Sequence, residues 1–268
     1  MAVRKWVWAG QFYPSGEKEL RSMIGSFDAA PAQKERALGI MSPHAGYIYS
    51  GPVAGAVYSA VEIPDKVIIL ATKHRMPGKD LALWEGGQWE TPLGVSEVDA
   101  DLSRRLMKYC PLAEFDNTPH LQEHSAEVQL PFLQYYNPDV SISVMSVHSE
   151  NLKELQEVGR GVAKAIKAVE GDVLIVASTD MSHYVPRSLA EEKDRLAIDA
   201  VLALDEEELF HVVHRHDISM CGYSPTVVMV AACKEMGAKE ARLVKYATSG
   251  DASGNYDAVV GYAGIAIS

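Results

Sequence analysis

The sequence predicts an α/β fold, in which a mixed β-sheet is covered by helices on both faces. Short apolar runs rich in β-branched residues alternate with longer segments of helical periodicity, and this alternation is typical of such a sheet. The chain closes with two strand-like segments joined by a short polar loop, residues 249–256, which predicts an antiparallel pair. No linker, repeat or low-complexity stretch interrupts the 268 residues, so we expect one domain over residues 1–268.

Three apolar runs have the length and β-branched content of buried strands. They cover residues 38–41, 67–70 and 173–177, and each is followed by a polar segment. A further strand is expected over residues 141–147, where apolar and polar residues alternate. The closing antiparallel pair is expected over residues 242–247 and 259–267.

Segments with apolar residues at helical spacing connect these strands. In residues 152–169, for example, Leu155, Val158 and Val162 fall on one side of the predicted helix. The other helices are expected over residues 50–62, 98–109, 124–135, 189–204, 206–213 and 224–236.

Charge and composition narrow the classes of function. The net charge is −11, with 25 Lys and Arg against 36 Asp and Glu. Nucleic-acid binding usually needs a surplus of basic residues, so we expect no nucleic-acid partner. The longest apolar runs are far shorter than a membrane span and no signal-peptide core is visible, which predicts a cytoplasmic protein without a membrane segment. The three cysteines are odd in number and widely spaced, which excludes a disulfide framework and a Cys-x-x-Cys zinc site.

The polar segments after the three buried strands carry the main candidate residues. They are Ser42-Pro43-His44-Ala45-Gly46-Tyr47, Ala71-Thr72-Lys73-His74 and Ser178-Thr179-Asp180-Met181-Ser182-His183. Ligands in α/β proteins gather at the carboxyl ends of parallel strands, so we expect these side chains to meet in one cleft. Three imidazoles and a carboxylate in one place can serve a metal ion or a substrate.

Two of these histidines have contrasting neighbours. Pro43 and a glycine-containing turn hold His44 in a loop, where its imidazole is presented to a ligand, although a histidine here can also simply cap the next helix. His74 stands between Lys73 and Arg75. These cations either point away from a metal or bind an anionic group, and the alternative is a solvated basic loop.

Asp180 and His183 are three residues apart, a spacing at which a carboxylate can orient an imidazole or work beside it as acid and base. The alternative for Asp180 is the capping of a helix. His124 is expected on the first turn of its helix, where it either transfers a proton in the cleft or fills a structural position.

Cys221 immediately precedes the apolar helix that begins near Ser224, and a helix N-terminus lowers the pKa of a thiol, which favours metal ligation. Cys233 is expected in the core, and Cys110 has no visible partner in the sequence. Three further histidines, His211, His214 and His216, follow an acidic run and are interpreted as a solvated surface. A set of histidines and one cysteine suits Fe(II), Cu or Zn, and spacing does not choose among them.

Several short motifs occur in order along the chain. They are Ala9-Gly10-Gln11-Phe12-Tyr13-Pro14, Pro43-His44-Ala45-Gly46-Tyr47, Tyr49-Ser50-Gly51-Pro52, Glu123-His124-Ser125, Gln129-Leu130-Pro131-Phe132, Ser178-Thr179-Asp180-Met181-Ser182-His183-Tyr184, Cys221-Gly222, Tyr246-Ala247-Thr248-Ser249-Gly250-Asp251 and Val260-Gly261-Tyr262-Ala263. Taken together and in this order, they resemble the MEMO family, of the AmmeMemoRadiSam system protein B type. The family is related to the class III extradiol (LigB-like) dioxygenases.

The resemblance implies a three-layer αβα sandwich around a mixed, mostly parallel sheet, with one cleft at the strand ends. Carried over residue by residue, it implies that His44, His74 and Cys221 bind a divalent metal, with Fe(II) or Cu favoured and Zn as a further option. It also implies that His124, Asp180 and His183 line the same cleft, where they are the candidate catalytic residues. The family usually has Gly-Pro-x-His before the second ligand, and Ala71-Thr72-Lys73-His74 departs from that pattern, which puts the aim of His74 in question.

The resemblance leaves the reaction open. The first hypothesis is a mononuclear metal-dependent oxidoreductase, similar to a dioxygenase, that acts on a small molecule. The second is a non-catalytic module that binds a peptide or a small anion in the same cleft, and Lys73 and Arg75 favour it. A zinc hydrolase is a third possibility. The resemblance also suggests radical-SAM and AMMECR1-type proteins as partners.

Overall fold

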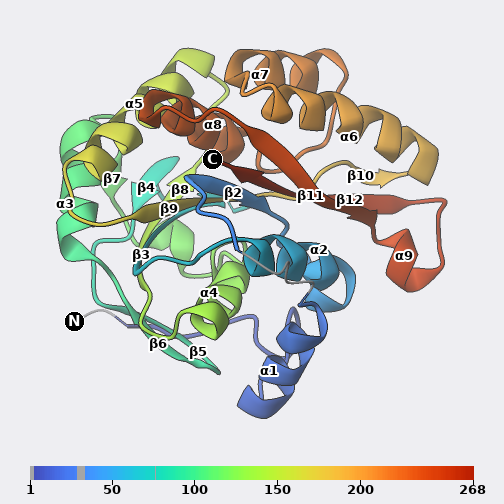
Figure 1. Ribbon diagram of the computed structural model, residues 1–268, viewed down its shortest axis with the longest axis horizontal. Helices are drawn as coiled ribbons and strands as arrows, with labels where there is room; N and C mark the ends of the chain where they lie inside the picture. Colours follow the sequence, from blue (N-terminus) through green and yellow to red (C-terminus); the bar gives the residue numbers. More distant parts are fainter. Residues whose placement is uncertain (1–2, 29–33, 76) are drawn as a thin grey trace.

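The computed structural model describes residues 3–28, 34–75 and 77–268, and it confirms the α/β fold (Figure 1). A nine-stranded mixed sheet runs through the molecule, and a smaller three-stranded sheet stands beside it. The strands of the large sheet are β2 (Gly39–Ser42), β3 (Lys66–Thr72), β4 (Leu81–Leu83), β7 (Glu114–Phe115), β8 (Ser141–Val147), β9 (Val173–Ser178), β10 (His183–Val185), β11 (Ala241–Thr248) and β12 (Val259–Ile267). The small sheet consists of β1 (Val3–Arg4), β5 (Gln88–Thr91) and β6 (Gly94–Glu97).

The centre of the large sheet is parallel, in the order β2-β9-β3-β8. Ser42 pairs with Ser178, and Leu70 pairs with Ala177, so the carboxyl ends of β2, β9 and β3 are level with one another. The flanks are antiparallel, because β12 pairs with β2 and β4 pairs with β8. The predicted closing pair is confirmed as β11 and β12, which pair antiparallel.

Helices cover both faces of the sheet, as predicted (Figure 1). On one face lie α3 (Ala100–Tyr109), α5 (Leu152–Lys167), α6 (Arg187–Leu202), α7 (Glu206–Arg215) and α8 (Tyr223–Met236), and on the other lie α1 (Glu17–Ser26), α2 (Tyr47–Ala60) and α4 (Leu130–Tyr136). A short helix, α9 (Gly250–Ser253), lies in the loop between β11 and β12. Six of these helices match the predicted segments within a few residues at each end: α2, α3, α5, α6, α7 and α8.

Alternation along the central strands divides the core into two layers. Ile68 and Leu70 of β3 pack into one hydrophobic cluster with α3, α5 and α8, whereas Val67 and Ile69 pack into a second cluster with α1, α2 and α4. Full burial of one such side chain contributes about 1.5–3 kcal/mol, so the two clusters hold the central strands rigidly. The strand ends that lead into the candidate residues are therefore fixed by packing on both faces of the sheet.

One predicted helix begins later than expected. The segment from His124 to Tyr135 consists of a 3₁₀ turn, η2 (Glu127–Gln129), followed by α4, and His124 lies in the loop before them. The Glu123 carboxylate accepts hydrogen bonds from the backbone N–H groups of His124 and Ser125, which holds the loop outside helical geometry. The short strands β1, β4, β5, β6, β7 and β10 were not predicted, because two to four residues carry too little periodicity. The helix α1 was not predicted either.

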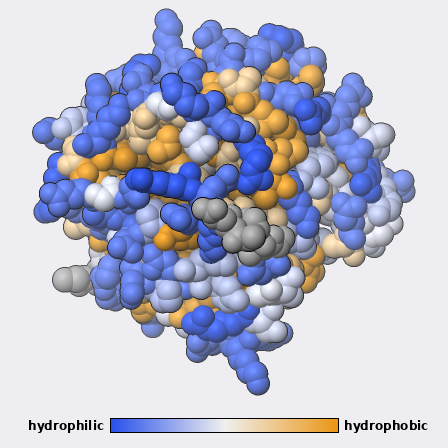
Figure 2. Space-filling view, viewed as in Figure 1, coloured by the Kyte–Doolittle hydropathy of each residue, from blue (hydrophilic) through white to orange (hydrophobic). Residues whose placement is uncertain are grey.

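In the view of Figure 2, hydrophilic residues dominate the outline of the molecule, and hydrophobic residues show between them nearer the middle of the face. Within the described ranges, no helix combines the length and the apolar character that crossing a bilayer requires.

Candidate metal centre

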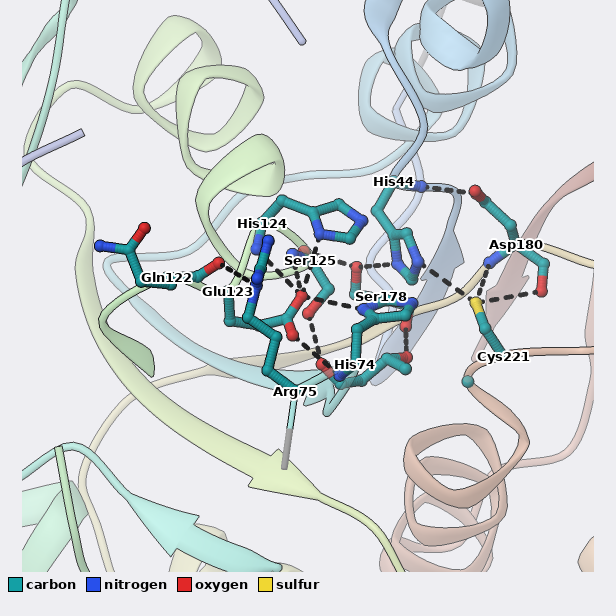
Figure 3. Close-up of polar contacts among 12 residues, drawn as sticks. His44, His74, Arg75, Gln122, Glu123, His124, Ser125, Ser178, Asp180 and Cys221 are labelled. Atoms are coloured by element: carbon teal, nitrogen blue, oxygen red, sulfur yellow. Dashed lines mark hydrogen bonds and ion pairs between the residues drawn. The ribbon is translucent and has the colours of Figure 1, made fainter. Parts of the chain in front are cut away.

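Three loops meet at the carboxyl ends of β3 and β9 through a closed ring of hydrogen bonds (Figure 3). The Thr72 hydroxyl donates to the Ser178 carbonyl at 2.8 Å, and the Ser178 hydroxyl donates to the Ser125 carbonyl at 2.6 Å. The Ser125 hydroxyl completes the ring by donating to the Thr72 carbonyl at 2.8 Å. Buried hydrogen bonds of this kind fix geometry because each broken bond would leave a polar group without a partner. The ring thereby fixes the loops that carry His74, His124 and Asp180.

The structure brings together the three predicted metal ligands. One ligand atom each from His44, His74 and Cys221 lies within 4.8 Å of the other two. The Cys221 sulfur is 3.2 Å from Nε2 of His44, and the rings of His44 and His74 meet edge to face with centroids 5.0 Å apart. The departure from the family pattern at residues 71–74 therefore leaves His74 aimed at the other two residues.

His44 is almost fully buried, with 1% of its surface exposed. Its backbone N–H donates to Oδ1 of Asp180 at 2.7 Å, and its Nδ1 lies 2.9 Å from the Ser178 hydroxyl. Burial, followed by the nearby imidazoles of His124 and His74, holds the pKa of His44 well below its usual range. The ring is therefore neutral at physiological pH, and neutral imidazole is the form that binds metals.

Cys221 lies two residues before the start of α8, as predicted, but the predicted direction of its pKa shift is wrong. Burial raises the pKa of the thiol, and the nearby Asp180 carboxyl adds to the effect. The cost of burying a thiolate exceeds its stabilisation by the hydrogen bonds from the Asp180 backbone N–H and the Thr179 hydroxyl, so without a metal the side chain is a thiol. The next residue must be glycine, because a Cβ at Gly222 would lie 2.4 Å from Cβ of Thr179.

Glu123, for which the sequence predicted no role, holds two of the histidines in place. Its Oε1 lies 2.9 Å from Nδ1 of His74 and 3.2 Å from Nδ1 of His124, and its Oε2 accepts the backbone N–H of His74 at 2.9 Å. Burial favours a higher pKa for this carboxyl, but the hydrogen bonds and charges of His124 and His74 outweigh burial and hold its pKa well below its usual range. The ionised carboxylate accepts hydrogen bonds, so each histidine presents Nδ1–H to it.

His74, Glu123 and His124 form a second group in which one possible ligand atom of each residue lies within 4.8 Å of the other two. The Glu123 oxygens already accept five hydrogen bonds and ion-pair contacts from these loops, which suits a residue that orients ligands better than one that binds the metal. The position of Glu123 directly before His124 in the Glu-His-Ser motif was the available signal, whereas its contact with His74 spans 49 residues.

The three predicted catalytic residues lie in different settings. The His124 ring stacks on His74 with centroids 4.6 Å apart, and it meets the His44 ring edge to face at 5.2 Å. Asp180 is buried behind His44, and burial raises the pKa of its carboxyl. His183 is half-buried, with its Nδ1 2.8 Å from the Ser219 carbonyl. Its electrostatic interaction contributes a lowering of the pKa of both His44 and Asp180.

The two basic residues beside His74, Lys73 and Arg75, are each held by contacts with other residues. Lys73 donates to Asp80 at 2.6 Å and to the Gly78 carbonyl, and only 4% of its side chain is exposed. Arg75 donates to the Gln122 carbonyl and lies over the ring of Trp8 at 5.6 Å from its centroid. Trp8 and Phe12 in turn pack against His124, at ring distances of 5.9 Å and 4.7 Å.

The remaining histidines and cysteines named above lie away from the site. His211, His214 and His216 lie on or just after α7 with exposed side chains, in agreement with the predicted solvated surface. Cys233 is buried in the core as predicted, and burial raises the pKa of Cys110 to about 12. In the part of the chain that the structure describes, both groups with metal-ligand geometry belong to the one site at the strand ends.

Comparison with known proteins gives a consistent result over nearly the whole chain. A family model described as "Memo-like protein" matches residues 4–266. The chain is 40% identical to a MEMO1 family protein of Methanopyrus kandleri, with 96% of each protein covered. It is 42% identical to MEMO1 family proteins of Pyrobaculum aerophilum and of Aquifex aeolicus, with 99% of each protein covered.

Proposed function

Since the chain belongs to the Memo-like protein family, we propose that it is a mononuclear metalloprotein in which His44, His74 and Cys221 hold one redox-active metal, Fe(II) or Cu. The observation that carries the proposal is the convergence of two imidazoles and one thiol, with one ligand atom of each within 4.8 Å of the others. Three protein ligands leave further coordination positions for a small-molecule substrate.

The chemistry of the donor set is compatible with both proposed metals and favours Cu over Fe(II). Imidazole suits Fe, Cu and Zn alike, and a thiolate shifts the preference towards Cu(I) or Zn. The partners behind the ligands are also those of a metal site, because Glu123 orients His74, and Ser178 contacts His44 on the nitrogen that faces away from Cys221. A zinc ion, which would support hydrolysis, remains the alternative occupant.

The surrounding residues have distinct tasks in this proposal. When bound, the metal supplies Lewis-acid and one-electron chemistry. His124 donates Nδ1–H to Glu123, and His183 donates Nδ1–H to the Ser219 carbonyl, so each keeps Nε2 for accepting or returning a proton. Asp180 acts through His44, whose backbone N–H it holds at 2.7 Å.

Metal content tests the proposal directly. The protein is purified without oxygen and without added chelator, and bound Fe, Cu and Zn are measured together with those of His44→Ala and Cys221→Ser. The expected result is close to one metal per chain in the wild type and a large loss in both variants. His211→Ala, an exposed histidine on α7, is the matched control and should retain the metal. A wild type that carries none of the three metals, even after anaerobic loading, would contradict the proposal.

The second candidate function is a metal-independent module for a peptide or a small anion. Of the two basic residues that favour it, Asp80 neutralises Lys73, so its support is reduced to Arg75, which lies beside Trp8. Binding of an acidic peptide that persists in chelator and in Cys221→Ser, and that is lost in Arg75→Ala, would favour it. Association with radical-SAM and AMMECR1-type proteins stays a prediction.

A further inference from the structure

The Ser178 hydroxyl lies within hydrogen-bond distance of three partners, and their capacity to donate or accept a proton decides its own role. Its Oγ is 2.6 Å from the Ser125 carbonyl oxygen, 2.8 Å from Nε2 of Gln129 and 2.9 Å from Nδ1 of His44. A serine hydroxyl has one proton to donate and two lone pairs that accept. A backbone carbonyl can only accept, so the single proton of Ser178 belongs to the contact with Ser125.

Gln129 fills one of the two lone pairs. Its side-chain nitrogen also donates to the Pro43 carbonyl at 3.0 Å, and its side-chain oxygen accepts from the Tyr58 hydroxyl at 2.9 Å. A flipped amide would direct its oxygen at the Pro43 carbonyl, so the amide orientation is fixed by its surroundings. Gln129 therefore donates to Ser178 and leaves one lone pair, which faces His44.

We infer that Ser178, held by Gln129 and Tyr58, locks His44 in the form that carries its proton on Nδ1, so that Nε2 alone can bind a metal. The Ser178 hydroxyl has no second proton to offer, so the contact at 2.9 Å requires a donor on His44. The nitrogen left free, Nε2, is the one that lies 3.2 Å from the Cys221 sulfur. Ser178, Gln129 and Tyr58 are thus positioning residues that act through His44.

All members of this network are shielded from solvent. Ser178 and Gln129 are 0% exposed, and Tyr58 is likewise buried. Water therefore cannot replace a lost partner easily, and a change at Ser178 is felt at His44. Residues that orient a metal-binding histidine typically change metal affinity by about 10–100-fold when they are removed. This consequence for affinity rests on the proposed metal site, whereas the position of the proton does not.

Nitrogen NMR of the metal-free, reduced protein labelled with ¹⁵N-histidine tests the inference. The signals of His44 are assigned by their loss in His44→Gln. The wild type is expected to show the proton on Nδ1 and a bare Nε2. Ser178→Ala is expected to move a substantial part of the population to the Nε2–H form and to weaken Cu(I) or Zn(II) binding by about 10–100-fold.

Ser146→Ala is the matched control, because Ser146 is a buried serine on β8 whose hydroxyl has no hydrogen-bond partner among the described residues. It should leave both the tautomer and the affinity unchanged. A wild-type His44 protonated on Nε2 overturns the inference even if Ser178→Ala fails to fold. An unchanged Nδ1–H signal in a folded Ser178→Ala also overturns it. If the wild type shows Nδ1–H and yet binds no metal, the proposed function fails and the tautomer lock stands.

Discussion

One carboxylate organises two of the imidazoles at this site. Glu123 is 2% exposed, and it contacts Nδ1 of both His74 and His124 together with the backbone N–H groups of three residues, His74, His124 and Ser125. An ionised carboxylate is the group that can accept from all of these donors at once. The orientation of His74 is therefore set by a residue that lies 49 positions further along the chain.

Glu123→Gln tests this role. The amide nitrogen cannot accept, so one of the donors now facing the carboxylate loses its partner, and His74 loses its fixed orientation. We expect metal affinity to fall by about 10–100-fold. The measurement is a competition titration with a chromophoric chelator. Glu114→Gln, at an exposed glutamate on β7, should bind metal like the wild type. An affinity of Glu123→Gln within twofold of the wild type would exclude the assigned role.

Metal binding should depend on pH through Cys221. The pKa of this thiol is raised by burial, so the thiol proton has to leave when the metal enters. The pKa of His44 is lowered, so this ring adds no proton at neutral pH. Release of one proton means that affinity rises about tenfold for each pH unit between about pH 6 and pH 8.

Competition titrations at several pH values, with calorimetry in two buffers to count released protons, give the measurement. In Cys221→Ser the affinity should be lower overall, and the part of the slope that belongs to the thiol should vanish. A wild-type affinity that does not change with pH would show that Cys221 is not a ligand.

At the scale of elements, the N-terminal segment is attached to the site loop by a buried ion pair. Arg4 of β1 donates to the Glu127 carboxylate at 2.7 Å, and also to the carbonyls of His120 and Glu123. Glu127 in turn accepts from the backbone N–H groups of Val7 and Trp8. This cluster connects the segment carrying Trp8 with the loop that carries Glu123 and His124.

Arg4→Met should therefore cost far more than the loss of a surface ion pair. It leaves the buried Glu127 charge without its cationic partner and removes the Arg4 donor from two carbonyls, and breaking a buried pair typically costs about 3–5 kcal/mol. Urea unfolding at neutral pH is the measurement. Arg21→Met breaks the exposed pair with Glu17 on α1 and should change the unfolding free energy by less than about 1 kcal/mol. Equal effects of the two variants would show that the Arg4 cluster does not stabilise this segment.

The elements differ in how well the sequence predicts them. The central strands and six of the larger helices follow from periodicity, because each buries one face or one stripe in the core. The loop at residues 121–126 does not, because the side chain of Glu123 replaces the helical hydrogen bonds there. The candidate ligands His44 and His74 follow from their strand ends, whereas the partnership of Glu123 and Gln129 with them depends on contacts between distant segments.

At the scale of the whole molecule, buried histidines make the free energy of unfolding decrease as the pH falls. Burial lowers the pKa of His120 to about 4, and the charge of Arg4 adds to this effect against the hydrogen bond to the Ala82 carbonyl. The folded state thus keeps this ring neutral, whereas the unfolded chain takes up the proton near pH 6.5. Its contribution is fully present above about pH 6.5 and is lost as the pH falls towards 4.

The expected loss for His120 is about 2 kcal/mol between about pH 7.5 and pH 5. Urea unfolding of the chelator-treated protein at both pH values measures it. His44, whose pKa is also lowered, acts in the same direction, so the comparison with His120→Gln isolates the share of His120. The variant should lose about 2 kcal/mol less than the wild type over this interval. Parallel pH profiles for the two proteins would contradict the assignment.

The order of the ligands along the chain has a consequence for biosynthesis. His44 and His74 leave the ribosome early, whereas Cys221 follows after about four-fifths of the chain. Strand β12, which pairs with β2 beside the site, emerges later still. A growing chain therefore offers two imidazoles without the thiol, and all three side chains can converge only after Cys221 has been synthesised. On the proposed function, the metal is therefore held by all three residues only after Cys221 has been synthesised.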